Sequence, residues 1–178
     1  MDLRTERTKR SIINSFLELR AKKSIEKITV KELAELAFIN KATFYSHYSD
    51  IYELAEQLEE ETIAAVLDGI PHPEYIFDHP KQAVYELTMA LTAKEGLVQM
   101  LFSGSREGLL MQKLEEGLKE RIYAKYPQYR GNLKWDIVLS VIITGNFHAF
   151  SEQKGKNVEE VCEVLGDISE CLKENFLK

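Results

Sequence analysis

Hydrophobic residues recur at spacings of three and four along most of the chain, which is the period of an amphipathic helix. Residues 8–20 are the first example, with Ile12, Phe16 and Leu19 at this spacing. No Asn-Gly or Asp-Gly joins two alternating β-branched runs, so the usual hairpin signal is absent. The pattern predicts an all-α fold with a proline-rich loop over 72–79. Further helices are expected over about 29–37, 41–48, 50–68, 81–92, 95–103, 106–126, 132–153 and 157–176.

Capping residues mark several of these helix starts. Thr29 and Glu32 form a capping box, in which the Thr29 hydroxyl accepts the Glu32 amide and the Glu32 side chain returns to the Thr29 amide. Asn40 is placed to cap the next short helix, because its side-chain oxygen can take a free amide of the first turn. Asp50 and Glu53 repeat the capping-box pattern before the longer helix.

The net charge of −6 is unevenly distributed. Residues 1–50 hold ten Lys or Arg against seven Asp or Glu, whereas residues 51–178 hold thirteen against twenty-two, giving +3 and −9. This asymmetry permits a small N-terminal module that contacts phosphates while the rest does something else. The sequence therefore predicts two domains, 1–48 and 49–178.

The chain has the composition of a globular protein, with 44% hydrophobic and 29% charged residues. No apolar run approaches the roughly 20 residues needed to cross a bilayer, so we expect no membrane partner and a cytoplasmic protein. Cys162 and Cys171 lie nine residues apart and face opposite sides of any helix they share, which excludes a disulfide within it and suits a reducing compartment.

Residues 29–48 have the pattern of a helix-turn-helix. Ala34 provides the small residue that two steeply crossing helices need at their closest approach. The apolar contacts that fix the crossing come from Leu33, Ala37, Ile39 and Phe44. With that core turned inward, the second helix presents Lys41, Ala42, Thr43, Tyr45, Ser46 and His47 outward.

The outward side chains suit contact with duplex DNA. Lys41 can reach a guanine edge or a phosphate, and Thr43 offers a hydroxyl and a methyl group that can meet a thymine methyl. Tyr45 and His47 can donate hydrogen bonds to phosphate oxygens, which positions the module without reading sequence. A flexible N-terminal arm with further backbone or minor-groove contacts is expected from Arg4, Arg7 and Arg10.

Three stretches, Ile28–Val30, Leu33–Ala34 and Thr43–Tyr48, carry a resemblance to a known family. Together with the order of three short helices followed by a long one, they make about the first 60 residues similar to the DNA-binding domain of the tetracycline-repressor (TetR/AcrR) family. The resemblance implies a homodimeric regulator of transcription, usually a repressor, that binds a palindromic operator and is released by a small-molecule effector. It also implies that the third helix enters the major groove, with Thr29 and Lys31 at the phosphate edge.

The chain departs from the family pattern at two positions. Phe38 stands where the turn commonly has a glycine, so either the turn avoids positive φ or Phe38 is held there by packing. Ile51 stands near the start of the fourth helix, where many members have a phosphate-contacting lysine. One phosphate contact is therefore expected to be missing.

The last two predicted helices, about 132–153 and 157–176, carry apolar stripes that suggest an association surface. The resemblance implies that they form a four-helix interface between two copies of the chain, and the alternative is packing within one subunit only. The stripe residues are Ile137, Val141, Thr144, Gly145, His148 and Ala149 in the first helix, and Val158, Val161, Leu165, Ile168 and Leu172 in the second.

The same region contains methionine and aromatic residues that suit a small apolar or aromatic effector, although core packing is the commoner role for each residue taken singly. The candidates are Tyr85, Met89, Met100, Phe102, Met111, Trp135 and Phe147. The acidic and histidine residues of the 72–79 loop lack the fixed spacing of a metal site, and no cofactor motif is present, so neither metal nor cofactor is expected.

Three classes of function are compared on this basis. A DNA-binding regulator switched by a small molecule fits the motifs best. A co-regulator or DNA-bound interaction protein on the same scaffold, responding to a protein partner, is the alternative. An enzyme is not expected, because no catalytic constellation is apparent.

Overall fold

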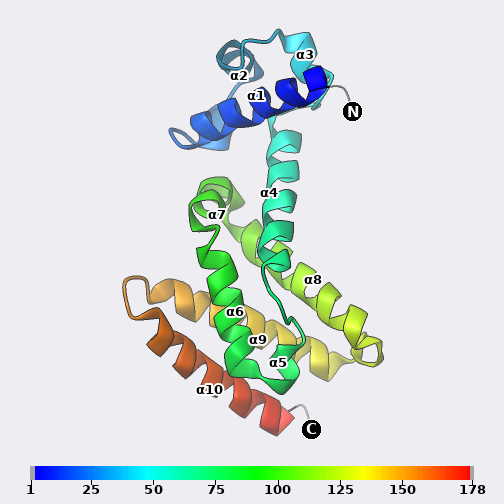
Figure 1. The fold of residues 1–178 in the computed structure, drawn as a ribbon, viewed down its shortest axis with the longest axis vertical. Coiled ribbons are helices and arrows are strands. Elements are labelled where there is room, and N and C mark those ends of the chain that lie inside the picture. The colour runs from blue at the N-terminus through cyan, green and yellow to red at the C-terminus, as the bar shows by residue number, and fades with distance from the viewer. Residues whose placement is uncertain (1–2, 177–178) are drawn as a thin grey trace. The chain divides into compact units, whose positions relative to one another are not determined.

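The computed structural model describes residues 3–176, which form ten α-helices and no strand (Figure 1). This confirms the all-α prediction. Most helix bounds lie within two or three residues of those predicted; the first helix begins earlier, and one short helix lies in the expected loop. The helices are α1 (Leu3–Arg20), α2 (Val30–Leu36), α3 (Lys41–Tyr45), α4 (Ile51–Asp68), α5 (Tyr75–Asp78), α6 (Pro80–Thr92), α7 (Glu95–Leu101), α8 (Glu107–Lys125), α9 (Leu133–Glu152) and α10 (Val158–Phe176).

The chain divides into two compact units. The N-terminal unit comprises Met1–Thr62 and Gly96–Gly108, and the C-terminal unit comprises Ile63–Glu95 and Leu109–Lys178. This division differs from the one expected at residues 48–49. The first part of α4, up to Thr62, belongs to the N-terminal unit, and so do residues 96–108, although they are distant in sequence.

The core of the N-terminal unit fixes the helix-turn-helix segment. Ile12 and Phe16 of α1, Leu33 of α2, Phe44 of α3 and Leu54 of α4 have no exposed surface. A hydrogen bond of 3.0 Å from the Ser11 hydroxyl to the carbonyl of Ala37 ties α1 to the end of α2. Of the apolar positions predicted at the crossing, Leu33, Ala34, Ala37 and Phe44 are buried, whereas Ile39 is partly exposed.

Two arginines bind the 96–108 segment to the rest of this unit. The buried Arg20 donates hydrogen bonds to the carbonyl of Met100 at 2.8 Å and to the Ser103 hydroxyl at 2.8 Å, near the C-terminal end of α7 where carbonyls lack helical partners. Arg106 donates two hydrogen bonds to the carboxylate of Glu59, at 2.7 and 2.5 Å. Glu59 is fully buried, and its hydrogen bonds raise the pKa of Arg106 above the ordinary value.

In the C-terminal unit, α10 packs against α6 and α9 (Figure 1). Val84 of α6 and Cys162 and Leu165 of α10 form a buried cluster, against which Val158 and Val161 pack. Gly166 permits this close approach, because an added Cβ would lie 2.8 Å from the Cα of Lys81. Within residues 3–176, none of the helices is long and apolar enough to span a membrane.

Candidate nucleic-acid interface and internal cavity

Of the two hydrogen bonds that the capping box predicts at the start of α2, one forms and the other does not. The Thr29 side chain accepts a hydrogen bond from the Glu32 amide at 3.2 Å. The Glu32 carboxylate pairs with Lys23 instead of returning to the Thr29 amide. Thr29 and Lys31 are both exposed, and the Lys31 ammonium lies 4.0 Å from the Glu35 carboxylate, so this lysine is free to turn toward solvent or a phosphate.

The turn between α2 and α3 is a Schellman motif, the hydrogen-bonded helix ending that usually has glycine at its left-handed position. The Ile39 amide donates to the carbonyl of Ala34 at 3.0 Å, and the Phe38 amide donates to the carbonyl of Glu35 at 3.3 Å. Phe38 holds the left-handed position with φ +55°, and it is the one non-glycine residue with positive φ among residues 3–176.

The conformation of Phe38 contradicts both alternatives drawn from the sequence. The turn does not avoid positive φ, and the Phe38 side chain is not held by packing, because 94% of the residue's surface is exposed. The Schellman hydrogen bonds hold the backbone of the turn instead.

Asn40 caps α3 as predicted. Its side-chain oxygen accepts hydrogen bonds from the Thr43 amide at 2.7 Å and from the Thr43 hydroxyl at 3.0 Å. The Ser46 hydroxyl donates to the Thr43 carbonyl at 2.7 Å, just after the helix ends at Tyr45. α3 is thus a five-residue helix, stabilised at both ends, rather than a helix that continues to Tyr48.

The side chains of the α3 region divide between core and surface largely as predicted. Phe44 points into the core. Lys41, Ala42, Tyr45 and Ser46 are exposed, whereas Thr43 and His47 are partly buried.

Tyr48, which ends the segment, is buried, and its hydroxyl has no hydrogen-bond partner among the described residues. Burial raises the pKa of Tyr48 to about 12, so its phenol stays neutral at physiological pH.

No family model and no curated protein matches this chain.

The beginning of α4 adds no positive charge to the exposed surface of α2 and α3. Ile51 is buried and belongs to the core, so its side chain does not reach a phosphate. Asp50 accepts the Glu53 amide at 2.8 Å, and Glu53 accepts the amide of Ser49, which lowers the pKa of Glu53. The first turn of α4 therefore has two carboxylates where a phosphate would be repelled.

Arg4, Arg7 and Arg10 do not form an extended arm. They belong to α1, which begins at Leu3, and all three are exposed on that helix. The sequence prediction of a flexible arm is wrong for the described residues, because the helical pattern continues to the third residue.

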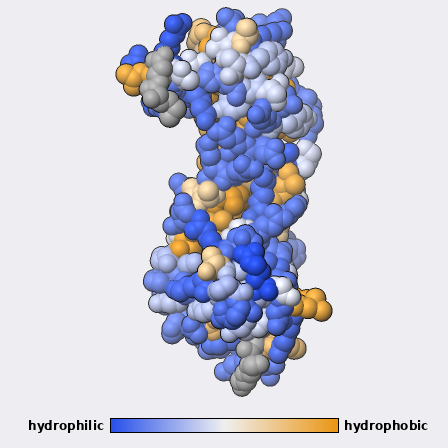
Figure 2. Space-filling view, turned by 90° about the vertical axis from the view of Figure 1, so that its right-hand side faces the viewer, coloured by the Kyte–Doolittle hydropathy of each residue, from blue (hydrophilic) through white to orange (hydrophobic). Residues whose placement is uncertain are grey.

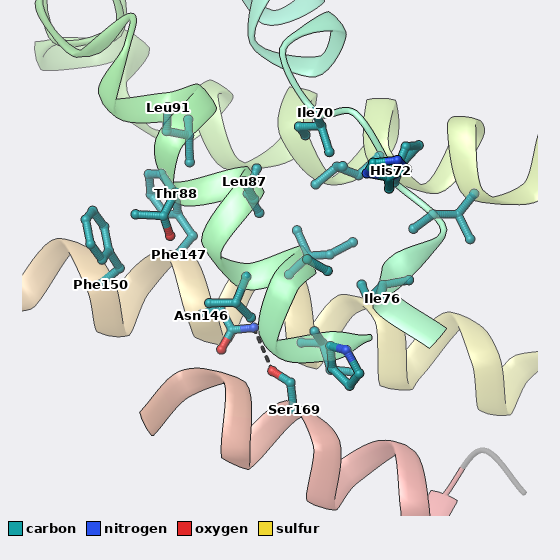
Figure 3. A pocket seen from close by; sticks show the side chains of 18 residues that line it. Ile70, His72, Ile76, Leu87, Thr88, Leu91, Asn146, Phe147, Phe150 and Ser169 are labelled. Atoms are coloured by element: carbon teal, nitrogen blue, oxygen red, sulfur yellow. Dashed lines mark hydrogen bonds between the residues drawn. The ribbon is translucent and has the colours of Figure 1, made fainter. Parts of the chain in front are cut away.

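The C-terminal unit contains an apolar cavity of about 40 Å³ (Figure 3). Side chains from α6, α8, α9 and α10 line it, including Leu87, Leu91, Ile122, Ile143 and Phe147. This volume holds only a few atoms, whereas sites for drug-sized ligands measure roughly 300–1,000 Å³.

Polar groups at the cavity already have partners. His72 lies 3.1 Å from a Glu86 oxygen through its ring nitrogen, and Glu86 also accepts the His72 amide at 3.1 Å. The Asn146 amide donates to the Ser169 hydroxyl at 2.9 Å, as the dashed line in Figure 3 marks. The surface left for a ligand is therefore mainly hydrocarbon.

Of the seven residues proposed from sequence as a ligand pocket, Phe147 lines this cavity and the others do not. Met100 and Phe102 belong to the N-terminal unit, and Trp135 stacks on Tyr129 with ring centroids 3.8 Å apart. The remaining three, Tyr85, Met89 and Met111, are exposed or partly buried elsewhere in the C-terminal unit. Within residues 3–176, no group of three His, Cys, Asp or Glu residues is placed to hold a metal ion.

On α10, the apolar residues that are exposed differ from those predicted to form the association surface. Ile137 and Val141 of α9 and Ile168 of α10 are about half exposed, as expected, and so is Val164 of α10, which lies outside the predicted stripe. The half of the predicted α10 stripe formed by Val158, Val161 and Leu165 packs within the unit instead. The exposed apolar face of α10 is therefore rotated from the one expected, because α6 covers the other side.

Proposed function

We propose that the chain is a sequence-specific DNA-binding regulator of transcription, of the tetracycline-repressor type, that acts as a homodimer in the cytoplasm. The observation that supports this most is the α2–turn–α3 arrangement. It has a closed apolar core and caps at both helix starts, and the second helix presents Lys41, Ala42 and Tyr45 to solvent. A helix-turn-helix of this kind places the N-terminal end of its second helix against base edges in the major groove.

Different side chains of this surface have different roles in the proposal. Lys41, Ala42 and Thr43 lie in the first turn of α3 and read base edges. The phosphate contacts, which position the module, come from Thr29, Lys31, Tyr45, Ser46 and His47.

Two substitutions test this division of roles. Lys41→Ala should change which duplexes are preferred, because it removes a base-reading donor. Tyr45→Phe should weaken binding to specific and random duplexes by a similar factor, because it removes a phosphate contact. Fluorescence anisotropy on both kinds of duplex measures this, and Lys156→Ala in the exposed loop before α10 controls for the lost charge. Equal losses on all duplexes for Lys41→Ala would contradict the assignment.

We further propose that the exposed apolar faces of α9 and α10 pair with those of a second copy. The four half-exposed residues Ile137, Val141, Val164 and Ile168 support this, and so does Gly145, where nothing lies within 4 Å of an added Cβ. A two-fold dimer also matches the symmetry of a palindromic site.

Light scattering tests the dimer. Ile168→Glu should give a folded monomer at micromolar concentration, because a carboxylate in a helix interface loses its hydration. Tyr85→Glu is the matched control, since Tyr85 is similarly exposed but lies on α6. A wild-type chain that is monomeric under the same conditions would refute this part of the proposal.

The cavity is the proposed site of a small apolar effector that releases the repressor from DNA. Its lining is mainly hydrocarbon, and its volume is too small for a typical effector, so binding must separate the helices around it. A ligand that does so would raise the melting temperature and lower the affinity for DNA. Leu91→Trp, which fills the cavity from α6, should abolish both effects.

A further inference from the structure

Phe38 combines two features that are unfavourable for a side chain without a partner. Its backbone holds positive φ, which costs free energy for any residue with a Cβ, and its phenyl ring gains nothing from burial because the residue is 94% exposed. Strained residues of this kind concentrate at functional sites.

Hydrogen bonds hold the backbone of the turn at Phe38. The amides of Phe38 and Ile39 are both bound to carbonyls of α2, and α3 is capped by Asn40 two residues later. Two residues of chain span at most about 7 Å, so Phe38 lies close to the first turn of α3. The ring is therefore carried by a hydrogen-bonded turn beside the N-terminal end of α3. This is the end of the helix that would approach base edges.

We propose that Phe38 is a DNA-contact residue whose ring packs against the methyl group of a thymine in the major groove, beside the bases read by α3. The inference rests on the proposed DNA-binding function. An aromatic ring is one of the few side-chain groups that recognise this methyl, which is also the one apolar group on the major-groove edges of the bases.

The surroundings of Phe38 favour DNA over a protein partner. Among its neighbours along the chain, the exposed Glu35, Asn40 and Lys41 are polar, and the apolar Leu36 and Ile39 are only partly exposed. Figure 2 shows the surface of the N-terminal unit, at the top, as mainly hydrophilic with isolated hydrophobic side chains. A stable protein interface needs some 20–30 residues from each side, whereas one ring suffices for one methyl group.

Phe38→Gly and Phe38→Ala distinguish the contribution of the ring to DNA affinity from the effect of the backbone strain on stability. Both remove the ring and should lower the affinity for the selected operator by about tenfold or more, from loss of the buried aromatic contact. Only glycine relieves the strain, so Phe38→Gly should raise the melting temperature, whereas Phe38→Ala should leave it unchanged because alanine keeps the Cβ and the lost ring was exposed. A residue with only a structural role would lose affinity and stability together.

Replacement of thymine by deoxyuridine, one position at a time, identifies the partner of the ring. At one position in each half-site, loss of the methyl group should weaken wild-type binding by about fourfold and leave binding of Phe38→Ala unchanged. This coupling would support the inference. It is overturned if either variant binds as tightly as the wild type, or if every deoxyuridine affects wild type and variants equally. A wild-type chain that selects no duplex at all refutes the proposed function itself, which is a distinguishable result.

Discussion

The ion pair between Arg106 and Glu59 should contribute strongly to the stability of the N-terminal unit. Arg106→Met removes the guanidinium and leaves the Glu59 carboxylate, which has no exposed surface, without its two hydrogen bonds of 2.7 and 2.5 Å. The carboxylate then loses both of these hydrogen bonds and keeps little access to water. A charge left in this state destabilises the folded protein, whatever the net contribution of the intact pair.

The expected loss is about 3–5 kcal/mol of unfolding free energy, the range for removing one partner of a buried pair. The Arg106 side chain retains 17% exposure, so some water can approach the carboxylate once the guanidinium is gone, which favours the lower end. For a chain of this length, about 3 kcal/mol corresponds to a fall in melting temperature of roughly 6–12 °C.

Urea denaturation followed by far-ultraviolet circular dichroism measures this loss, at one fixed protein concentration because association changes apparent stability. The double variant Glu59→Leu with Arg106→Met removes both charges and should recover most of the lost stability, since an apolar pair can replace a buried ion pair. Lys22→Met breaks an exposed ion pair with Glu18 at the end of α1 and should change the unfolding free energy by less than about 1 kcal/mol. If Arg106→Met behaves like Lys22→Met, or if the double variant is the least stable of all, the reasoning is wrong.

Three further changes test other parts of the structure by the same denaturation assay. Gly166→Ala should lower the unfolding free energy by about 1–3 kcal/mol, because its Cβ would lie 2.8 Å from the Lys81 backbone. In the control Gly145→Ala the added Cβ meets nothing within 4 Å, so it should not destabilise the protomer. Equal effects of the two substitutions would contradict the α6–α10 packing. Tyr48→Phe should raise stability by about 1 kcal/mol, since it removes a buried hydroxyl without a partner, and a loss would reveal an unrecognised one. Asn40→Ala should cost about 1 kcal/mol and weaken DNA binding by loss of the α3 cap, and unchanged stability would contradict the role of that cap.

Local patterns in the sequence predict the helices and their starts well. Period and capping are properties of neighbouring residues, so the caps at Thr29 and Asn40 can be read without knowledge of the fold. The second hydrogen bond of the first capping box, from the Thr29 amide to the Glu32 side chain, does not form. The reason is not local, because the Glu32 carboxylate pairs with Lys23 instead.

Features that depend on distant contacts are not predicted. Arg20 is an ordinary helical arginine in the sequence, yet it binds carbonyls some 80 residues away. The cavity is missed because candidates chosen by residue type, such as Met100 and Trp135, lie in different units. On α10 the sequence has apolar residues on two faces, and only the position of α6 decides that Leu165 is covered while Ile168 is exposed.

Selection of bound duplexes from a random DNA pool, followed by affinity measurements across a salt series, is the most direct test of sequence-specific DNA binding by this chain. We expect the selected duplex to be palindromic and bound by a dimer, with affinity that falls steeply as salt rises because phosphate contacts release counterions. We also expect Lys41→Ala to select a different duplex. Weak binding with no consensus sequence would contradict the claim that this chain is a sequence-specific regulator.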